Sequence, residues 1–342
     1  MIGLVRLEAV WGSHYLIERP PALERRRNLL YLPWGPEQRW GVFDEDGLAL
    51  AAAWEHGPLG SPIPPAHTAF RLDQPLAVEA ALARTAEVVR EPLIYGGRVH
   101  THFGHFLMET LPRWWSARGR RRILVHGAAD LEAWWVTPWV AELLGALRLS
   151  AADFVRFDRP TLCRDLHVPA PSLRAQAYAH RVFGRLCRDM GDRLLAGRRL
   201  QPGGPPVYLS KSRLPTGVNG LIDEAVLEAR LAAGGVEIVH PELMTTADKA
   251  ALFATRPAVL GVAGSGFHLG LFAPPMARQL RLTLGPMVNS GHKLADALSG
   301  CDAVDLHQPG TEAVGGGAFQ ANWRLPDPQG AAAALLEWCG RS

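Results

Sequence analysis

The sequence has few cysteines, no long apolar run and little net charge. Its four cysteines lie far apart without a CxxC pair, which argues against both a zinc knuckle and a disulfide framework, so we expect free thiols in a reducing compartment. No stretch of about 18 apolar residues is free of charge, and residues 1–21 lack the basic start and continuous apolar core of a signal peptide. We therefore expect a cytoplasmic protein, with peripheral docking at the inner face of the membrane left open.

Charge of either sign is nearly balanced, with 36 basic against 33 acidic residues and a net charge of +3. Nucleic-acid-binding domains carry a much stronger basic excess, so we expect no nucleic-acid partner. The basic run RGRRR at residues 118–122 is more typical of a solvated loop than of a binding patch. Small anionic ligands remain compatible with this balance.

The chain is long enough for two domains. Its 342 residues exceed the roughly 250–300 at which a single core stops growing, and 48% of them are hydrophobic. Residues 1–95 alternate short apolar runs with turn signals, which predicts a β-rich opening region within an N-terminal lobe of residues 1–200. The Pro- and Gly-rich stretch at 201–206 marks the boundary, followed by a second lobe at 205–330 and a last helix at 331–342.

Strand and helix patterns alternate along both lobes, which predicts an α/β fold with parallel sheets. In the first lobe the pattern predicts strands at 123–127 and 153–157 and helices at 138–149 and 177–197. In the second lobe it is clearer. Strands are expected at 207–210, 236–239, 258–264 and 279–285, with helices at 222–234, 246–256 and from about Ser265. Such a doubly wound half binds ligands beyond the carboxyl ends of its strands, here after Ser210 and after Val262.

The segment His100–Trp115, HTHFGHFLMETLPRWW, carries the densest group of titratable side chains. As a helix from about 102 to 111 it would bury an aromatic stripe and present His102, His105 and Glu109 on the opposite stripe. His105 and Glu109 are four residues apart, so the carboxylate can orient the imidazole as a general base. A metal site built on His100, His102, His105 and Glu109 is the alternative, although the spacing is not HExxH.

Two further motifs favour an anionic ligand in the second lobe. Gly264 and Gly266 form a Gly-x-Gly turn between a strand and a helix, where backbone N–H groups and the helix dipole attract phosphate. Lys211 and Arg213 follow the first strand of the same sheet and could neutralise a diphosphate held at that turn. His268 lies one turn into the helix, where it can face the ligand or be a buried core histidine.

These segments together resemble the glycosyltransferase 61 family. The family's FGHFLxExLPR segment is matched by Phe103–Arg113, and its YLSR/K strand followed by Arg and Asn by Tyr208–Arg213 with Asn219. Pro241-Glu242 corresponds to a PE after the next strand, and Gly264–Phe272 to the Gly-x-Gly turn and helix. The likeness covers about residues 95–285. This chain has Ala263 and Leu269 where many members have His and Asn.

The resemblance implies a GT-B-like fold of two facing Rossmann-like lobes. It also implies an inverting transfer from a nucleotide sugar, often UDP-linked, to a hydroxyl of a glycan acceptor, with no cofactor and no metal. In that case His105 or Glu109 is the base. The residues implied on the acceptor side are His102 and Arg113. The residues implied at the donor are Lys211, Arg213, Asn219, Glu242, Gly264, Ser265, Gly266, Phe267 and His268.

Two other function classes remain open on the sequence. One is a metal-dependent hydrolase that uses the histidine cluster, which metal analysis of the purified protein would separate from the transferase. The other is a non-catalytic protein that binds nucleotides or glycans, which would bind a nucleotide sugar without transferring it.

Overall fold

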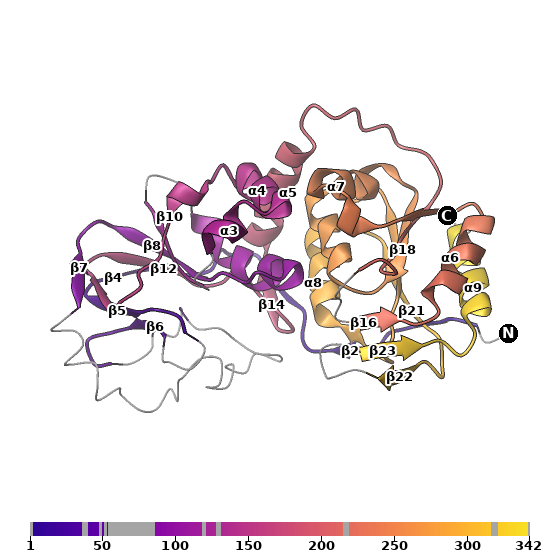
Figure 1. The fold of residues 1–342 in the computed structure, drawn as a ribbon, viewed down its shortest axis with the longest axis horizontal. Helices are drawn as coiled ribbons and strands as arrows, with labels where there is room; N and C mark the ends of the chain where they lie inside the picture. The colour runs from indigo at the N-terminus through magenta and orange to yellow at the C-terminus, as the bar shows by residue number, and fades with distance from the viewer. Residues whose placement is uncertain are drawn as a thin grey trace. The chain divides into compact units, whose positions relative to one another are not determined.

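A computed structural model describes residues 3–35, 40–47, 50, 53, 86–117, 121–127, 131–214, 219–315 and 321–340 of the protein. It is a mixed α/β structure with several sheets, as expected (Figure 1). The chain divides into two units. We call Gly12–Leu186 the N-terminal unit, and Met1–Trp11 together with Cys187–Ser342 the C-terminal unit.

This division differs from the boundary that we expected at 201–206. The first eleven residues belong to the C-terminal unit because β1 (Val5–Arg6) pairs antiparallel with β21 (Ala303–His307). The division falls within helix α5 (Arg181–Leu194), which is shorter than the helix expected at 177–197. Its first residues instead form strand β14 (Tyr178–His180), because they pair with other strands. Long-range pairing of this kind leaves no local trace in a sequence.

The C-terminal unit is built around a six-stranded sheet in the order β1-β21-β19-β18-β15-β17. Its central strands are β15 (Val207–Leu209), β17 (Glu237–Val239), β18 (Ala258–Val262) and β19 (Arg278–Leu282). They run parallel to one another and to β21, and only the edge strand β1 is antiparallel. When the five parallel strands are numbered in chain order, they lie side by side in the order 2-1-3-4-5, which is a doubly wound topology.

Helices cover both faces of this sheet. Helices α6 (Glu224–Ala233) and α9 (Pro328–Gly340) lie on one face, and α7 (Thr246–Thr255) and α8 (Ser290–Ser299) on the other (Figure 1). Because both faces are covered, β15 and β18 are apolar and buried along their whole length. Strands β19 and β21 instead carry buried polar residues, among them Arg281 and Asp305. The last helix, expected as a separate element, packs on α6 within this core.

Shorter elements complete the C-terminal unit. They are β2 (Val10–Trp11), β16 (Asn219–Leu221), η6 (Pro241–Leu243), η7 (Ser265–Phe272), β20 (Val288–Asn289), β22 (Glu312–Gly315) and β23 (Ala321–Arg324). The helix expected from Ser265 is a 3-10 helix, η7, and it ends shortly before Pro274-Pro275.

The N-terminal unit contains a five-stranded sheet in the order β10-β9-β8-β12-β4. Its strands are β4 (Leu23–Arg26), β8 (Leu93–Arg98), β9 (Ile123–His126), β10 (Phe154–Val155) and β12 (Leu166–Pro169). All but β4 are parallel to their neighbours. When the parallel strands are numbered in chain order, they lie side by side in the order 3-2-1-4, so the order of winding reverses between β8 and β12.

The remaining strands of this unit form two smaller sheets. They are β3 (Tyr15–Ile17), β5 (Leu29–Leu32), β6 (Gly41–Phe43), β7 (Glu87–Val89), β11 (Thr161–Cys163), β13 (Leu173–Arg174) and β14. The helices are α2 (Phe103–His105), η3 (Phe106–Thr110), η4 (Leu111–Ser116), α3 (Leu131–Trp135), α4 (Pro138–Leu147) and η5 (Ala151–Asp153). The strands before residue 54 agree with a β-rich opening region, of which 54–85 lies outside the described residues.

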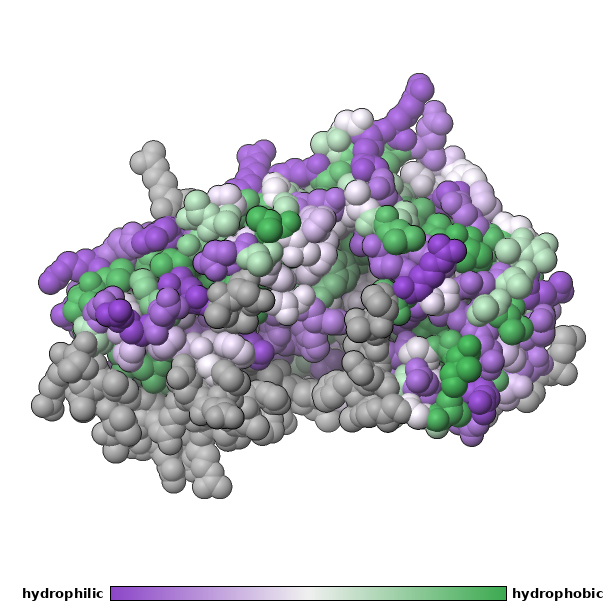
Figure 2. Space-filling model, in the orientation of Figure 1, coloured by the Kyte–Doolittle hydropathy of each residue, from purple (hydrophilic) through white to green (hydrophobic). Residues whose placement is uncertain are grey.

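Two expectations from the sequence concern membrane-spanning segments and the state of the cysteines. Among the described residues, no helix combines the length and apolar character needed to cross a bilayer. Hydrophilic and hydrophobic residues are interspersed on the face drawn in Figure 2. All four cysteines are free thiols, as the sequence predicts.

Candidate functional site

The candidate donor residues lie at the point where the winding of the C-terminal sheet reverses. Strands β15 and β18 are the first and third parallel strands of the sheet in chain order, yet they are direct neighbours. A crevice opens at such a reversal beyond the carboxyl ends of the two strands, and ligands bind there. Lys211 follows β15 and Gly264 follows β18, so both predicted anion-binding loops stand at this edge.

The Lys211 side chain lies directly over the glycine turn. Its Nζ donates a hydrogen bond of 3.3 Å to the Ala263 carbonyl, and a Cβ placed on Gly264 would lie 2.8 Å from that Nζ. Glycine at position 264 is therefore what allows the ammonium to approach the backbone. Burial lowers the pKa of Lys211, and the charge of Glu224 partly opposes this shift. A desolvated ammonium of this kind attracts an anionic ligand more strongly than a solvated one does.

Glu224 fixes the start of the Lys211 loop and was missed in the sequence. Its Oε1 accepts hydrogen bonds from the Lys211 backbone N–H at 3.0 Å and from the Tyr208 hydroxyl at 2.9 Å. The residue is almost fully buried, and burial raises the pKa of its carboxyl group. Nothing in the helical pattern of residues 222–234 distinguishes this glutamate from its solvated neighbours.

Glu242 lies at the same edge of the sheet, just beyond β17. Within the part of the chain that the structure describes, neither of its buried carboxylate oxygens has a hydrogen-bond partner, and His240 Nδ1 lies 3.9 Å from Oε1. A buried carboxylate is costly unless donors reach it. A carboxylate beyond the second strand of a doubly wound sheet is suited to accept hydrogen bonds from ribose hydroxyls.

A pair of buried histidines lies where η7 packs on α8. The rings of His268 and His292 stack with centroids 4.9 Å apart, and neither Nδ1 has a partner among the described residues. Burial lowers the pKa of His268 to about 4, with a smaller contribution from the charge of Arg281. The pKa of His292 is lowered by the same causes and by His268 itself. His268 was a predicted site residue, whereas His292 was missed because its partner lies 24 positions earlier in the sequence.

This histidine pair predicts a loss of stability in mild acid. In the folded state His268 stays neutral down to about pH 4, whereas an unfolded histidine binds a proton near pH 6.5. The unfolded state therefore binds more protons between pH 6.5 and 4, and stability falls as the pH falls through this window. We expect His268 alone to reduce the free energy of unfolding by about 2 kcal/mol between pH 7 and 5. Urea unfolding at both pH values measures this, and His268→Phe should reduce the difference while the exposed-site variant His14→Ala retains it.

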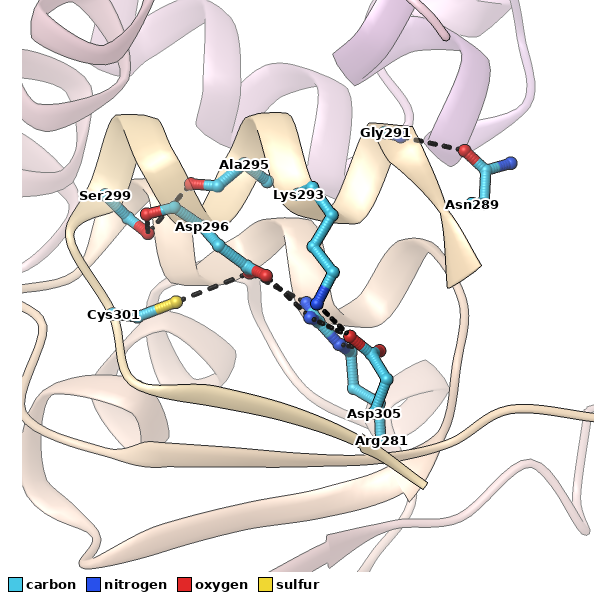
Figure 3. A network of polar contacts seen from close by, with 9 residues as sticks. All are labelled: Arg281, Asn289, Gly291, Lys293, Ala295, Asp296, Ser299, Cys301 and Asp305. Atoms are coloured by element: carbon cyan, nitrogen blue, oxygen red, sulfur yellow. Dashed lines mark hydrogen bonds and ion pairs between the residues drawn. The ribbon is translucent and has the colours of Figure 1, made fainter. Parts of the chain in front are cut away.

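A buried ionic network fixes α8 to the sheet (Figure 3). The guanidinium of Arg281 on β19 makes paired hydrogen bonds of 2.7 and 2.9 Å to Asp305 on β21, and of 2.8 and 2.6 Å to Asp296 on α8. Lys293 Nζ donates to the same Asp305 carboxylate at 2.7 Å. Burial acts to lower the pKa of Arg281, but the two carboxylates raise it above its ordinary value. The network sets the position of α8, which carries His292.

Three other predicted donor residues are placed differently. Arg213 is exposed, and the Asn219 amide oxygen accepts a hydrogen bond of 3.1 Å from the Trp323 indole. The Phe267 ring is almost fully buried, 6.4 Å from the ring of Phe253, so its side chain packs in the core. Apolar packing of the short η7 helix decides this orientation, because its third residue faces the sheet. Ser265 and Gly266 are the first residues of η7.

The histidine-rich segment occupies the corresponding position in the N-terminal unit. It follows β8, at the carboxyl end of the strand where the winding of that sheet reverses. In place of the expected single helix there are three short pieces, which are α2, the π-helix η3 and the 3-10 helix η4. Single π-helical turns such as η3 are frequent at functional sites. The expected two faces are present. Phe106, Leu107, Thr110 and Trp114 are buried, while His102 and His105 are exposed.

Glu109 joins two of the histidines. Its Oε1 lies 2.6 Å from His105 Nδ1, and its Oε2 lies 3.3 Å from His100 Nε2. His102 completes the group, because its ring centroid is 5.2 Å from that of His105. Burial lowers the pKa of His102, and the neighbouring His105 lowers it further. The ligand atoms of His100, His105 and Glu109 all lie within 4.8 Å of one another, so this is also a group that could hold a metal ion.

Arg113, which we expected on the acceptor side, is a buried structural cation. Its Nη1 donates to the Pro169 carbonyl at 3.4 Å, and its guanidinium lies 5.8 Å from the centre of the Tyr95 ring. The side chain lies against Gly97, which has a φ of +76° and leaves no room for a Cβ. Arg113 therefore holds η4 to the ends of β8 and β12. The expectation of an acceptor contact is corrected, since the guanidinium is directed into the protein.

The comparisons with known proteins bear on both groups of residues. A search of curated proteins found no match. A family model described as Glycosyltransferase 61 matches residues 103–280, which is just over half of the chain. The matched span contains the His105–Glu109 pair as well as Lys211 and the Gly264 turn. The chain therefore belongs to the glycosyltransferase 61 family, as the resemblance of its motifs predicted.

Proposed function

We propose that this glycosyltransferase moves a sugar, with inversion, from a nucleoside-diphosphate donor to a hydroxyl of a glycan acceptor. The donor that we expect is UDP-linked, and no metal takes part in the transfer. The observation that carries the proposal is the position of Lys211 over the Gly264 turn, at the reversal point of a doubly wound sheet. A partly buried ammonium beside an open backbone turn suits a diphosphate leaving group, whose charge a metal would otherwise neutralise.

The donor is assigned to the C-terminal unit and the acceptor to the N-terminal unit. In this proposal the two units act as the lobes of a GT-B-like enzyme that works in the cytoplasm and can associate peripherally with the membrane. Lys211 and the start of η7 contact the diphosphate, and the Glu242 carboxylate, which no described residue reaches with a hydrogen bond, accepts hydrogen bonds from the ribose. The exposed face of the histidine group receives the acceptor.

His105 is the general base in this proposal, and Glu109 orients it. An ionised carboxylate only accepts hydrogen bonds, so His105 Nδ1 carries the proton and donates it to Glu109 Oε1 at 2.6 Å. This tautomer leaves the Nε2 lone pair to take the proton of the acceptor hydroxyl. Both oxygens of Glu109 are occupied by histidines, which supports an orienting role for the carboxylate rather than that of the base.

The reaction then balances in a single displacement. The acceptor oxygen attacks the anomeric carbon from the face opposite the diphosphate as its proton passes to His105 Nε2. The bond between the anomeric carbon and the diphosphate oxygen breaks, and its electron pair leaves with the nucleoside diphosphate. Lys211 stabilises the charge that develops on that oxygen, and attack from the opposite face inverts the anomeric configuration.

The donor assignment is tested by nucleotide binding. A thermal-shift screen of nucleoside diphosphates identifies the ligand, because a ligand that binds only the folded state raises the melting temperature. Lys211→Met should weaken binding of UDP about 10- to 100-fold in calorimetry, since one charge-assisted hydrogen bond to phosphate is lost. Arg230→Met, a change at an exposed cation of the same unit, should leave the affinity unchanged. Equal UDP affinity of wild type and Lys211→Met would contradict the assignment.

A further inference from the structure

We propose that His100, His105 and Glu109 form a binding site for one divalent transition-metal ion of the Zn²⁺ type, and that the bound ion inhibits transfer. The inhibitory part rests on the proposed role of His105 as the base. The binding part rests only on the geometry of the three side chains. The site differs from a catalytic metal centre because the ion and the transferred proton use the same groups in incompatible ways.

The three side chains already have almost the spacing that a tetrahedral ion requires. Metal bonds of about 2.0–2.1 Å with tetrahedral angles place ligand atoms about 3.3–3.4 Å apart. His100 Nε2 and Glu109 Oε2 are 3.3 Å apart, and all three ligand atoms lie within 4.8 Å of one another. We expect rotation of the side chains to bring the other two pairs of ligand atoms to the required distance.

The ligand set selects the kind of metal. Two imidazoles and one carboxylate suit zinc and its neighbours in the first transition series, whereas Mg²⁺ and Ca²⁺ prefer sites made of oxygen atoms. Three protein ligands leave a fourth position, which water or the adjacent His102 can occupy. An ion can enter from solvent because the His105 side chain is 52% exposed and that of Glu109 is 28% exposed.

The local fold holds the ligands in place. The His100 backbone N–H donates to Thr110 Oγ1 at 3.0 Å, and that hydroxyl donates to the Arg98 carbonyl at 3.0 Å. His105 and Glu109 are held four residues apart in the turn formed by α2 and η3. Because these contacts are made by the backbone and Thr110 rather than by the ligand atoms, little ordering is required when an ion binds.

Metal binding and base catalysis exclude each other at His105. In the catalytic form Nδ1 carries the proton and Nε2 has the free lone pair. A metal bound through Nδ1 uses the lone pair of Nδ1, so the one proton of a neutral imidazole must reside on Nε2. His105 then has no lone pair with which to accept a proton from the acceptor hydroxyl. Glu109 is also withdrawn from orienting the ring, because its oxygens bind the ion.

The test is a Zn²⁺ titration of the purified full-length chain in competition with a chromophoric chelator. We expect one tight site in the wild type and binding at least about tenfold weaker in both His100→Ala and Glu109→Gln, since each loses a ligand. His14→Ala removes an exposed histidine of the same unit and should bind Zn²⁺ as the wild type does. If His100→Ala does not fold by circular dichroism, His100→Gln replaces it.

Two outcomes overturn the proposal. The first is that wild-type protein binds Zn²⁺ no more tightly than His100→Ala and Glu109→Gln, and the site then does not exist. The second is that Zn²⁺ binds but does not inhibit reversibly. The transfer rate then does not fall at the Zn²⁺ concentration that fills the site, or it does not recover when a chelator is added, and the proposal that the ion inhibits transfer is wrong. If the metal-free protein transfers sugar from no donor to any acceptor, the proposed function is contradicted. The Zn²⁺ titration still decides whether the metal site exists, because it does not depend on transfer.

Discussion

Replacing His105 by alanine should lower the turnover of sugar transfer by about 10²–10⁴-fold, which is the usual contribution of a positioned general base. Glu109→Gln should act in the same direction. The amide can accept a hydrogen bond from only one of the two histidines that Glu109 now joins, and it removes the charge that stabilises the imidazolium. Initial-rate kinetics with saturating donor and acceptor measure both effects.

The pattern of constants distinguishes a catalytic loss from a folding defect. Neither variant should change the affinity for UDP in calorimetry, because the proposed donor residues belong to the other unit. The loss should appear in kcat rather than in the KM for the donor, as expected when a transition-state contact is removed. Glu132→Gln, at an exposed glutamate of the N-terminal unit, serves as the control and should transfer at the wild-type rate. Full transfer rates in both His105→Ala and Glu109→Gln would exclude this pair from the chemistry.

Arg281→Met should destabilise the C-terminal unit by about 3–5 kcal/mol, because it leaves the Asp296 carboxylate without a cation and the buried Asp305 carboxylate with Lys293 alone. The side chains of Arg281 and Asp305 are fully buried, and that of Asp296 is 14% exposed. For a unit of this size the melting temperature should fall by about 6–20 °C, which calorimetry or circular dichroism can follow. The loss should exceed that of any single exposed ion pair.

Two further variants separate stranded charge from lost packing. Arg6→Ala breaks an exposed pair with Glu8 in the same unit and should cost less than about 1 kcal/mol. Adding Asp296→Asn to Arg281→Met removes the carboxylate that is left without a cation and should recover a large part of the lost stability. If Arg281→Met melts within a degree or so of the wild type, the network in Figure 3 does not hold α8 in place.

Local sequence patterns were enough to predict the features of the site that depend only on residues close together in the chain. The spacing of Phe106, Thr110 and Trp114 against His105 and Glu109 is enough to separate two faces. The structure buries the first three and exposes His105, whereas Glu109 is partly buried between two histidines. The strand and helix order of the C-terminal half was equally readable, because β15 and β18 are short apolar runs and helical patterns alternate with the strands. These features need only the periodicity of the backbone.

Other side chains could not be assigned from their neighbours. Arg113 and Phe267 stand within recognisable motifs, but their side chains are buried by strands and helices that the motifs do not contain. Glu224 and His292 lie outside every motif, and they gain their roles from Lys211 and His268, which are 13 and 24 positions away in the chain. A motif records residue types and spacing, whereas burial depends on what packs against it.

The sequence alone determined the α/β class, the family, the free thiols and the two segments that carry polar groups. Those properties follow from composition, periodicity and short motifs, which act over a few residues. Only the tertiary structure decided that Val5–Arg6 joins the C-terminal sheet, that Glu109 binds two histidines, and that β15 lies beside β18. Each of these is a contact between distant parts of the chain or a choice of side-chain rotamer. Its free energy depends on atoms brought together by folding, which no local pattern contains.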